Sequence, residues 1–158
     1  MSARFIGIDH GTKRIGLAVS DPLGSIASPL VTVEASGKPA EQVQRTIEAA
    51  TEQFDIDEWV VGHAIHMDGT EGSQAQVCSR FAKLLEAATG DPVHLWDERL
   101  SSAQADTYLA EGNLTYKKRK ARRDMLAAQI ILQSFLDARA VDDSPPIGGE
   151  LETDGPSL

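Results

Sequence analysis

The N-terminal sequence reads Phe5-Ile6-Gly7-Ile8-Asp9-His10-Gly11-Thr12-Lys13-Arg14-Ile15-Gly16-Leu17-Ala18-Val19. Two apolar runs, 4–9 and 14–20, flank a short glycine-containing turn, which predicts an antiparallel hairpin. Asp9 ends the first run, where a carboxylate costs desolvation energy unless a cation compensates it. A divalent metal would be that cation. Lys13 and Arg14 in the turn suggest an anionic substrate.

The rest of the chain alternates between strand and helix patterns. Residues 28–33, 59–62 and 93–96 have the composition of strands. Apolar residues recur at helical spacing in the segments 40–54, 77–88, 101–109 and about 120–140. A hairpin followed by this alternation predicts an α/β fold, a mixed five-stranded sheet flanked by helices.

Length and composition limit the organisation of the chain. With 158 residues and 41% hydrophobic content, it can form one domain with a core, which we expect over residues 1–140. Residues 141–158 are acidic and contain Pro and Gly, and we expect a disordered tail there. A single cysteine, Cys78, and the lack of a 20-residue apolar run favour a cytoplasmic protein without a membrane partner.

The charge is unevenly distributed. The net charge of −9 argues against a nucleic-acid partner, yet six of the 15 Lys and Arg residues lie within 117–123. These six are Lys117, Lys118, Arg119, Lys120, Arg122 and Arg123. Such a cluster can neutralise phosphates locally, and binding of this kind weakens with salt. The alternative is a solvated loop or helix face.

Two further acids occupy positions similar to that of Asp9. Glu98 follows the strand 93–96, and the ends of strands commonly hold catalytic groups, although acids are also common before a helix. Asp124 shares a helix face with Ala128, Ile131 and Phe135, the stripe that should meet the sheet. A carboxylate there needs a metal or a salt bridge to a neighbouring arginine.

Three acids beside a basic segment are suited to a two-metal nuclease. Carboxylate oxygens select Mg²⁺ or Mn²⁺, and two such ions about 3.5–4 Å apart can assist hydrolysis of a phosphodiester. The sequence alone does not bring the three acids together in space.

The chain resembles the YqgF/RuvX family of pre-16S rRNA nucleases, also described as Holliday-junction-resolvase-like. The resemblance rests on Gly7 to Ala18 with Ser20-Asp21, on Val60-Val61-Gly62 with Asp68-Gly69 and Gly72, on Asp97-Glu98-Arg99-Leu100, and on Asp124 to Gln133. It covers residues 5 to about 138. It implies a ribonuclease H-like fold, a metal-dependent endonuclease, and Asp9, Glu98 and Asp124 as its catalytic metal ligands.

The resemblance leaves the substrate open between 16S rRNA precursor ends and four-way DNA junctions, with rRNA maturation first by the family's usual assignment. Junction cleavage would favour a homodimer, whereas a monomer would suffice otherwise. Lys13, Arg14 and Arg99 are further candidates for contact with phosphate, although Arg99 could instead pair with an acid.

The chain departs from the family pattern in two places. His63-Ala64 stands where Leu-Pro is usual, which questions the local backbone, and Ser101-Ser102 replaces a Thr pair. His63, His66 and Asp68 could form an extra metal site, but their spacing favours an ordinary loop.

Two functions of other classes compete with a nuclease. An ATP-binding protein of the actin and sugar-kinase type places Asp, Gly and Thr similarly between two strands, but it needs two lobes and the chain is too short for them. A nucleic-acid-binding module without catalysis would not require the three acids.

Overall fold

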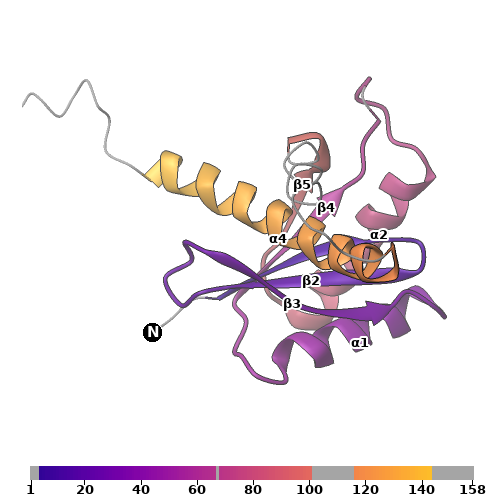
Figure 1. The fold of residues 1–158 in the computed structure, drawn as a ribbon, viewed down its shortest axis with the longest axis horizontal. Helices are drawn as coiled ribbons and strands as arrows, with labels where there is room; N and C mark the ends of the chain where they lie inside the picture. The colour runs from indigo at the N-terminus through magenta and orange to yellow at the C-terminus, as the bar shows by residue number, and fades with distance from the viewer. Residues whose placement is uncertain (1–3, 67, 101–115, 144–158) are drawn as a thin grey trace, which may run out of the picture.

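The computed structural model describes residues 4–66, 68–100 and 116–143 (Figure 1). Five strands form one sheet in the order β3-β2-β1-β4-β5. The strands are β1 (Phe5–His10), β2 (Arg14–Ser20), β3 (Ala27–Glu34), β4 (Glu58–His63) and β5 (Val93–Asp97). The helices are α1 (Pro39–Thr51), α2 (Ser73–Thr89) and α4 (Tyr116–Asp143), with a short 3-10 turn at Glu98–Leu100.

The sheet is mixed, as predicted. β1 and β2 form the expected antiparallel hairpin, in which Asp9 is paired with Gly16. β4 runs parallel to both β1 and β5, with Ile8 paired with Val61 and His63 with Asp97. The ends of β1, β4 and β5 therefore lie at one edge of the sheet, where chemistry is common in α/β proteins.

Helices cover both faces of the sheet (Figure 1). Alternation along β1 directs Ile6 and Ile8 into the core beneath α1 and α2, which also contains Phe81 of α2. Phe5 points to the other face and packs in a second core with Leu132 of α4. Alternate side chains of β1 thus pack against different helices, those of Ile6 and Ile8 against α1 and α2 and that of Phe5 against α4.

Gly7 allows α4 to lie directly on β1. A Cβ at position 7 would stand 2.5 Å from the Cβ of Leu132 and 2.9 Å from the carbonyl oxygen of Ala128. Contacts this close leave no room for a side chain. Gly7 therefore sets the distance between the sheet and α4.

Glutamine side chains of α4 fasten the helix to the edge of the sheet. Gln133 accepts a hydrogen bond from the Ala27 backbone N–H at 2.8 Å and donates to the Ser25 carbonyl at 2.9 Å. Gln129 donates to the Ala27 carbonyl at 3.1 Å. The turn before β3 is organised by Asp21, which accepts from the backbone N–H groups of Ser25 and Ile26.

The expected limits of α1 and α4 were wrong at both ends. α1 begins and ends earlier than the predicted 40–54, because the proline at its first position suits a helix start. α4 begins at Tyr116 rather than near 120, because Lys and Arg are good helix formers. It also includes 141–143, assigned above to the tail, since no helix breaker precedes Pro145. The predicted helix 101–109 and the remainder of the tail lie outside the described residues.

Candidate active site

Asp9 lies at the end of β1 between two glycines. Alternation from Phe5 and Gly7 places its side chain on the face covered by α4. Its partner on β2 is Gly16, and on β4 the residue after Val61, the partner of Ile8, is Gly62. Neither flanking position carries a side chain, and we call this strip of the sheet face, formed by Gly16, Asp9 and Gly62, the trough.

Glu98 reaches over β4 toward the same trough. It follows β5 in the 3-10 turn, and its side chain lies above Gly62. A Cβ at position 62 would stand 2.9 Å from Glu98 Oε2 and 2.6 Å from Cδ1 of Ile131 in α4. Gly62 thus leaves the space that the Glu98 side chain occupies over β4, next to the strand that carries Asp9.

The surroundings of Glu98 shift its pKa and that of a neighbouring thiol. Burial raises the pKa of Glu98, while the charge of His63 lowers it and that of Asp97 raises it. Burial also raises the pKa of the Cys78 thiol to about 11, and the charges of Glu98 and Asp9 add to this rise. Cys78 is fully buried in α2, as expected for a small apolar residue.

The path of α4 brings position 124 toward the trough. α4 runs antiparallel to β1, since Phe135 packs against Phe5 at 6.0 Å between ring centroids and Ala128 lies against Gly7. Asp9 is two residues beyond Gly7, about 7 Å along the strand, and Asp124 is four residues before Ala128, about 6 Å along the helix. The backbone of α4 therefore carries position 124 toward the end of β1, four residues before buried Ala128.

Arg99 is held by its neighbour. Its guanidinium donates to both carboxylate oxygens of Asp97, at 2.5 Å and 2.9 Å to Oδ2 and 3.0 Å to Oδ1. It also donates to the His66 carbonyl at 3.4 Å. Hydrogen bonds from Arg99 are the main cause that lowers the pKa of Asp97. The ion-pair interpretation of Arg99 is thus realised in the structure, and contact with phosphate stays a prediction.

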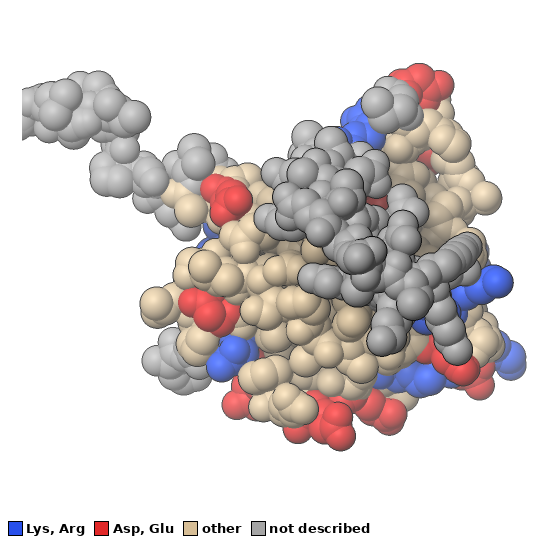
Figure 2. All heavy atoms as spheres, viewed as in Figure 1, with Lys and Arg blue, Asp and Glu red and all other residues tan. Residues whose placement is uncertain are grey.

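Other basic candidates lie at the turn between β1 and β2 and in α4. Lys13 is exposed in the turn, and Arg14 is half-buried as the first residue of β2. In Figure 2, Lys and Arg side chains gather at the edge where this turn projects in Figure 1, whereas acidic ones gather along the edge of α1. The basic run 117–123 forms the first turns of α4.

The histidines at the end of β4 and in the following loop contact residues of that loop and of α2. His63 Nε2 lies 2.7 Å from Glu71 and 3.3 Å from the Ser79 hydroxyl. Asp68 accepts from the backbone and hydroxyl of Thr70, which lowers its pKa. Within the part of the chain that the structure describes, no group of three His, Cys, Asp or Glu residues could hold a metal.

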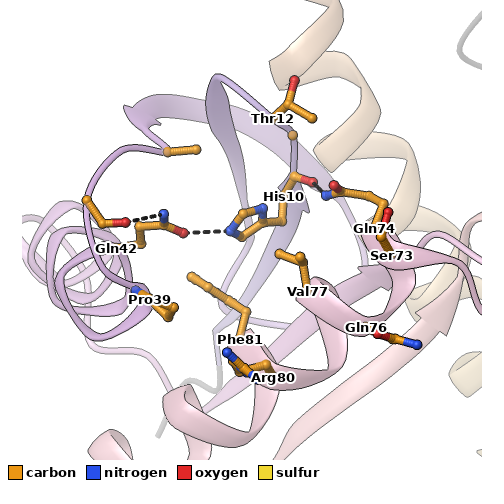
Figure 3. Close-up of a pocket in the computed structure, with 13 residues that line it drawn as sticks. His10, Thr12, Pro39, Gln42, Ser73, Gln74, Gln76, Val77, Arg80 and Phe81 are labelled. Carbon is orange, nitrogen blue, oxygen red and sulfur yellow. Dashed lines mark hydrogen bonds between the residues drawn. The ribbon is translucent and has the colours of Figure 1, made fainter.

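Sequence reasoning missed a second polar site on the opposite face of β1. His10 is buried beneath the β1–β2 turn, where its Nε2 lies 2.8 Å from Gln42 Oε1 of α1. Gln74 of α2 donates to the His10 carbonyl at 2.7 Å, so three elements meet here (Figure 3). The signal in the sequence is that His10 follows Asp9 directly and must point to the other face.

Comparison with known proteins covers most of the chain. Residues 3–138 match the RuvX family, which is described as a Holliday junction resolvase. A protein of Lachnospira eligens named "Putative pre-16S rRNA nuclease" is 42% identical over 139 residues, 86% of this chain and 98% of its own length. A protein of the same name from Protochlamydia amoebophila is 43% identical, over 87% of this chain and 95% of its own length.

A solved structure shares the fold. Thermus thermophilus RuvC in complex with a Holliday junction substrate superimposes with a TM-score of 0.50 and 19% sequence identity, over 87% of this chain and 96% of that one. The predicted ribonuclease H-like fold is thereby confirmed. No helix among the described residues is long and apolar enough to cross a bilayer.

Proposed function

Because this chain belongs to the RuvX family, we propose that it is a metal-dependent nuclease that hydrolyses phosphodiester bonds in structured nucleic acid. The observation that carries the proposal is the position of Glu98 over Gly62, the residue of β4 that lies beside Asp9 of β1. Asp9 at the end of β1 and Glu98 directly after β5 lie at the edge where β1, β4 and β5 all end. A lone structural acid at either strand end would not need this arrangement.

The residues of the trough fit a divalent cation. Carboxylate oxygens are the donors that Mg²⁺ and Mn²⁺ prefer, and the Glu98 carboxylate occupies the space over Gly62, the neighbour of Asp9 on β4. Burial raises the pKa of Glu98, and a cation nearby would favour its ionised form. We propose that Asp9, Glu98 and Asp124 are the ligands of two ions. Asp124 is included because the backbone of α4 runs toward the end of β1.

A bound cation would offset charge on the phosphate oxygens and lower the pKa of an attacking water. The protein's own groups would position the strand. Lys13 at the turn supports the approach of phosphate, and the basic first turns of α4 could follow the backbone on either side. Arg99, already paired with Asp97, would fix the turn that carries Glu98.

For the substrate, we propose the 5′ end of precursor 16S rRNA, processed in the cytoplasm. The names of the relatives from Lachnospira eligens and Protochlamydia amoebophila support this assignment. The description of the family supports a second candidate, cleavage of four-way DNA junctions. A junction has two-fold symmetry, so this activity would require a homodimer, whereas end maturation is compatible with a monomer.

The test uses purified protein with labelled precursor 16S rRNA and with a synthetic four-way junction, in Mg²⁺ or Mn²⁺. The proposal expects cleavage of one substrate and its loss in Asp9→Asn and Glu98→Gln. Cleavage of neither substrate by the wild type, or equal cleavage by the two variants, would overturn the nuclease assignment. Light scattering during the reaction separates a dimer from a monomer.

A further inference from the structure

A cavity of about 510 Å³ opens on the sheet face opposite Asp9 (Figure 3). It lies where the end of β1 meets the starts of α1 and α2. The residues that carry its chemistry are His10, Gln42, Gln74, Val77, Arg80 and Phe81. Its volume falls within the range of about 300–1,000 Å³ typical of small-molecule sites.

The electrostatics of this cavity favour an anion. The chain has a net charge of −9, yet none of the described residues that line the cavity is an Asp or Glu. α2 begins at its rim, and its N-cap residue, Gly72, provides no side-chain cap. The N–H groups at a helix start and their dipole attract anions. Arg80, exposed on α2, adds a cation that forms no ion pair within the described part of the chain.

The hydrogen bonds of His10 leave one polar atom without a partner. Gln42 donates through Nε2 to the Gly37 carbonyl at 3.2 Å, so its Oε1 faces His10 and accepts from Nε2. The neutral ring then carries its proton on Nε2, and Nδ1 is an acceptor. His10 is 6% exposed, and Nδ1 has no partner among the described residues. Such a buried acceptor is costly, and a donor entering with a small shift of the turn would satisfy it.

The floor and walls of the cavity suit a planar ring. Phe81 is almost fully buried beneath it and meets the His10 ring edge-on at 5.0 Å between centroids. Val77 is 42% exposed on the adjacent turn of α2 and forms an apolar wall. Gln74 donates to the His10 carbonyl, which leaves its Oε1 available to a ligand. Apolar surface with a few amide groups and a cation is the chemistry that binds a base together with its phosphate.

We propose that this cavity binds one nucleotide, with the base against Phe81 and Val77 and the phosphate near Arg80 and the start of α2. The nucleotide is a neighbour of the scissile phosphate in the strand that is cut, which rests on the proposed function. His10 follows Asp9 on β1, so the acidic trough and the cavity share the end of one strand. A free nucleotide has the same chemistry and is the other source to test.

Two variants and one control test the site on the full chain. Arg80→Gln removes the cation, and Val77→Trp fills the cavity from an exposed position. Lys83→Gln removes an equal charge from an exposed position on α2 outside the lining. Circular dichroism establishes that each variant folds.

The first experiment titrates the protein with AMP, UMP and inorganic phosphate and follows backbone amide signals by NMR. The nucleotides should shift the signals of 73–76 at lower concentration than phosphate does. Val77→Trp should abolish these shifts, and Arg80→Gln should weaken binding about tenfold, the loss of one charge-assisted contact. Equal shifts with phosphate alone would overturn the nucleotide in favour of a simple anion site.

The second experiment measures binding of the labelled precursor and junction without divalent metal. Arg80→Gln should reduce the slope of log affinity against log salt by about one relative to Lys83→Gln. An abasic substitution next to the cleaved bond should weaken binding to the wild type but not to Val77→Trp. These two results would establish that the bound nucleotide belongs to the strand that is cut. NMR shifts with AMP in their absence would establish that the cavity binds a free nucleotide.

The two proposals fail in different ways. The cavity proposal is overturned if the wild type cuts but nucleotides cause no NMR shifts, and Arg80→Gln and Val77→Trp bind substrate as Lys83→Gln does. The nuclease proposal would then stand. The nuclease proposal is overturned if the wild type cuts neither substrate. The nucleotide site stands in that case if AMP still shifts the amide signals and Val77→Trp abolishes those shifts.

Discussion

Glu98 lies directly over Gly62, with its Oε2 2.9 Å from the place where a Cβ of residue 62 would stand. The absence of a side chain on β4 thus determines where an acid from the end of β5 can go. Cδ1 of Ile131 in α4 lies 2.6 Å from the same Cβ position. The geometry of the site depends on this contact as well as on the acids themselves.

Gly62→Ala should therefore damage activity more than stability. The atoms that meet the new methyl are the ends of flexible side chains, so the free energy of unfolding should fall by about 1–3 kcal/mol. Displacement of the Glu98 carboxylate by about 1 Å should reduce cleavage about 100-fold. Urea unfolding and single-turnover cleavage measure the two effects.

A second substitution separates these effects. Ile131→Val removes the Cδ1 atom that a methyl at 62 would strike, so Gly62→Ala/Ile131→Val should regain part of the lost stability. Its activity should stay low, because Glu98 is still displaced. Activity that returns together with stability would mean that the position of Glu98 is not what limits cleavage.

Gly7→Ala should be the more destabilising substitution. Its methyl would meet the Cβ of Leu132 and the backbone of Ala128, which cannot rotate away. We expect a loss of at least about 2–3 kcal/mol, the upper part of the range for an overpacked core, together with a shift of α4. Thermal unfolding tests this, and a loss no larger than that of Gly62→Ala would show that α4 adapts readily.

Gln133→Leu should loosen α4 from the edge of the sheet. It removes three hydrogen bonds, two of them to the sheet edge, and leaves the N–H of buried Ala27 without its partner, at a cost of about 1–3 kcal/mol. Gln44→Leu, at an exposed site of α1 where the amide bonds only Glu48, is the matched control and should be nearly neutral. Equal effects of the two in urea unfolding would contradict this role of Gln133.

Asp21→Ala should destabilise the protein in a pH-dependent manner. Hydrogen bonds from the Ile26 and Ser25 backbone lower the pKa of Asp21 in the folded protein. A lowered pKa contributes stability above the unfolded value, about 3.9, and this stability is lost as pH falls through the folded pKa. The difference between wild type and variant in urea unfolding should be full at pH 7 and shrink below about pH 4. A difference independent of pH would assign the effect to something other than this carboxylate.

Local pattern predicted much of the fold. The apolar runs around 10–13 identified the hairpin, and the helical spacing of Ala128 and Ile131 after Asp124 identified the buried face of α4. The limits of α1 and α4 were less accurate, because helix ends depend on caps and breakers that compete over a few residues.

The site was only partly predictable. The motifs singled out Asp9 and Glu98, and strand ends suggested that they could meet. The reach of Glu98 over Gly62 depends on the order of the strands, which a sequence without an alignment does not reveal. The cavity around His10 was missed for the same reason, since Gln42 and Gln74 are 32 and 64 residues away.

The central claim is that Asp9 and Glu98 hold a divalent cation together, and Mn²⁺ binding measures it most directly. Electron paramagnetic resonance of free Mn²⁺, titrated with protein, gives affinity without substrate. Asp9→Asn and Glu98→Gln should each weaken binding at least about tenfold, while Asp55→Asn, the same charge change at an exposed site, should not. Mn²⁺ binding that is equal in all four proteins would contradict the account.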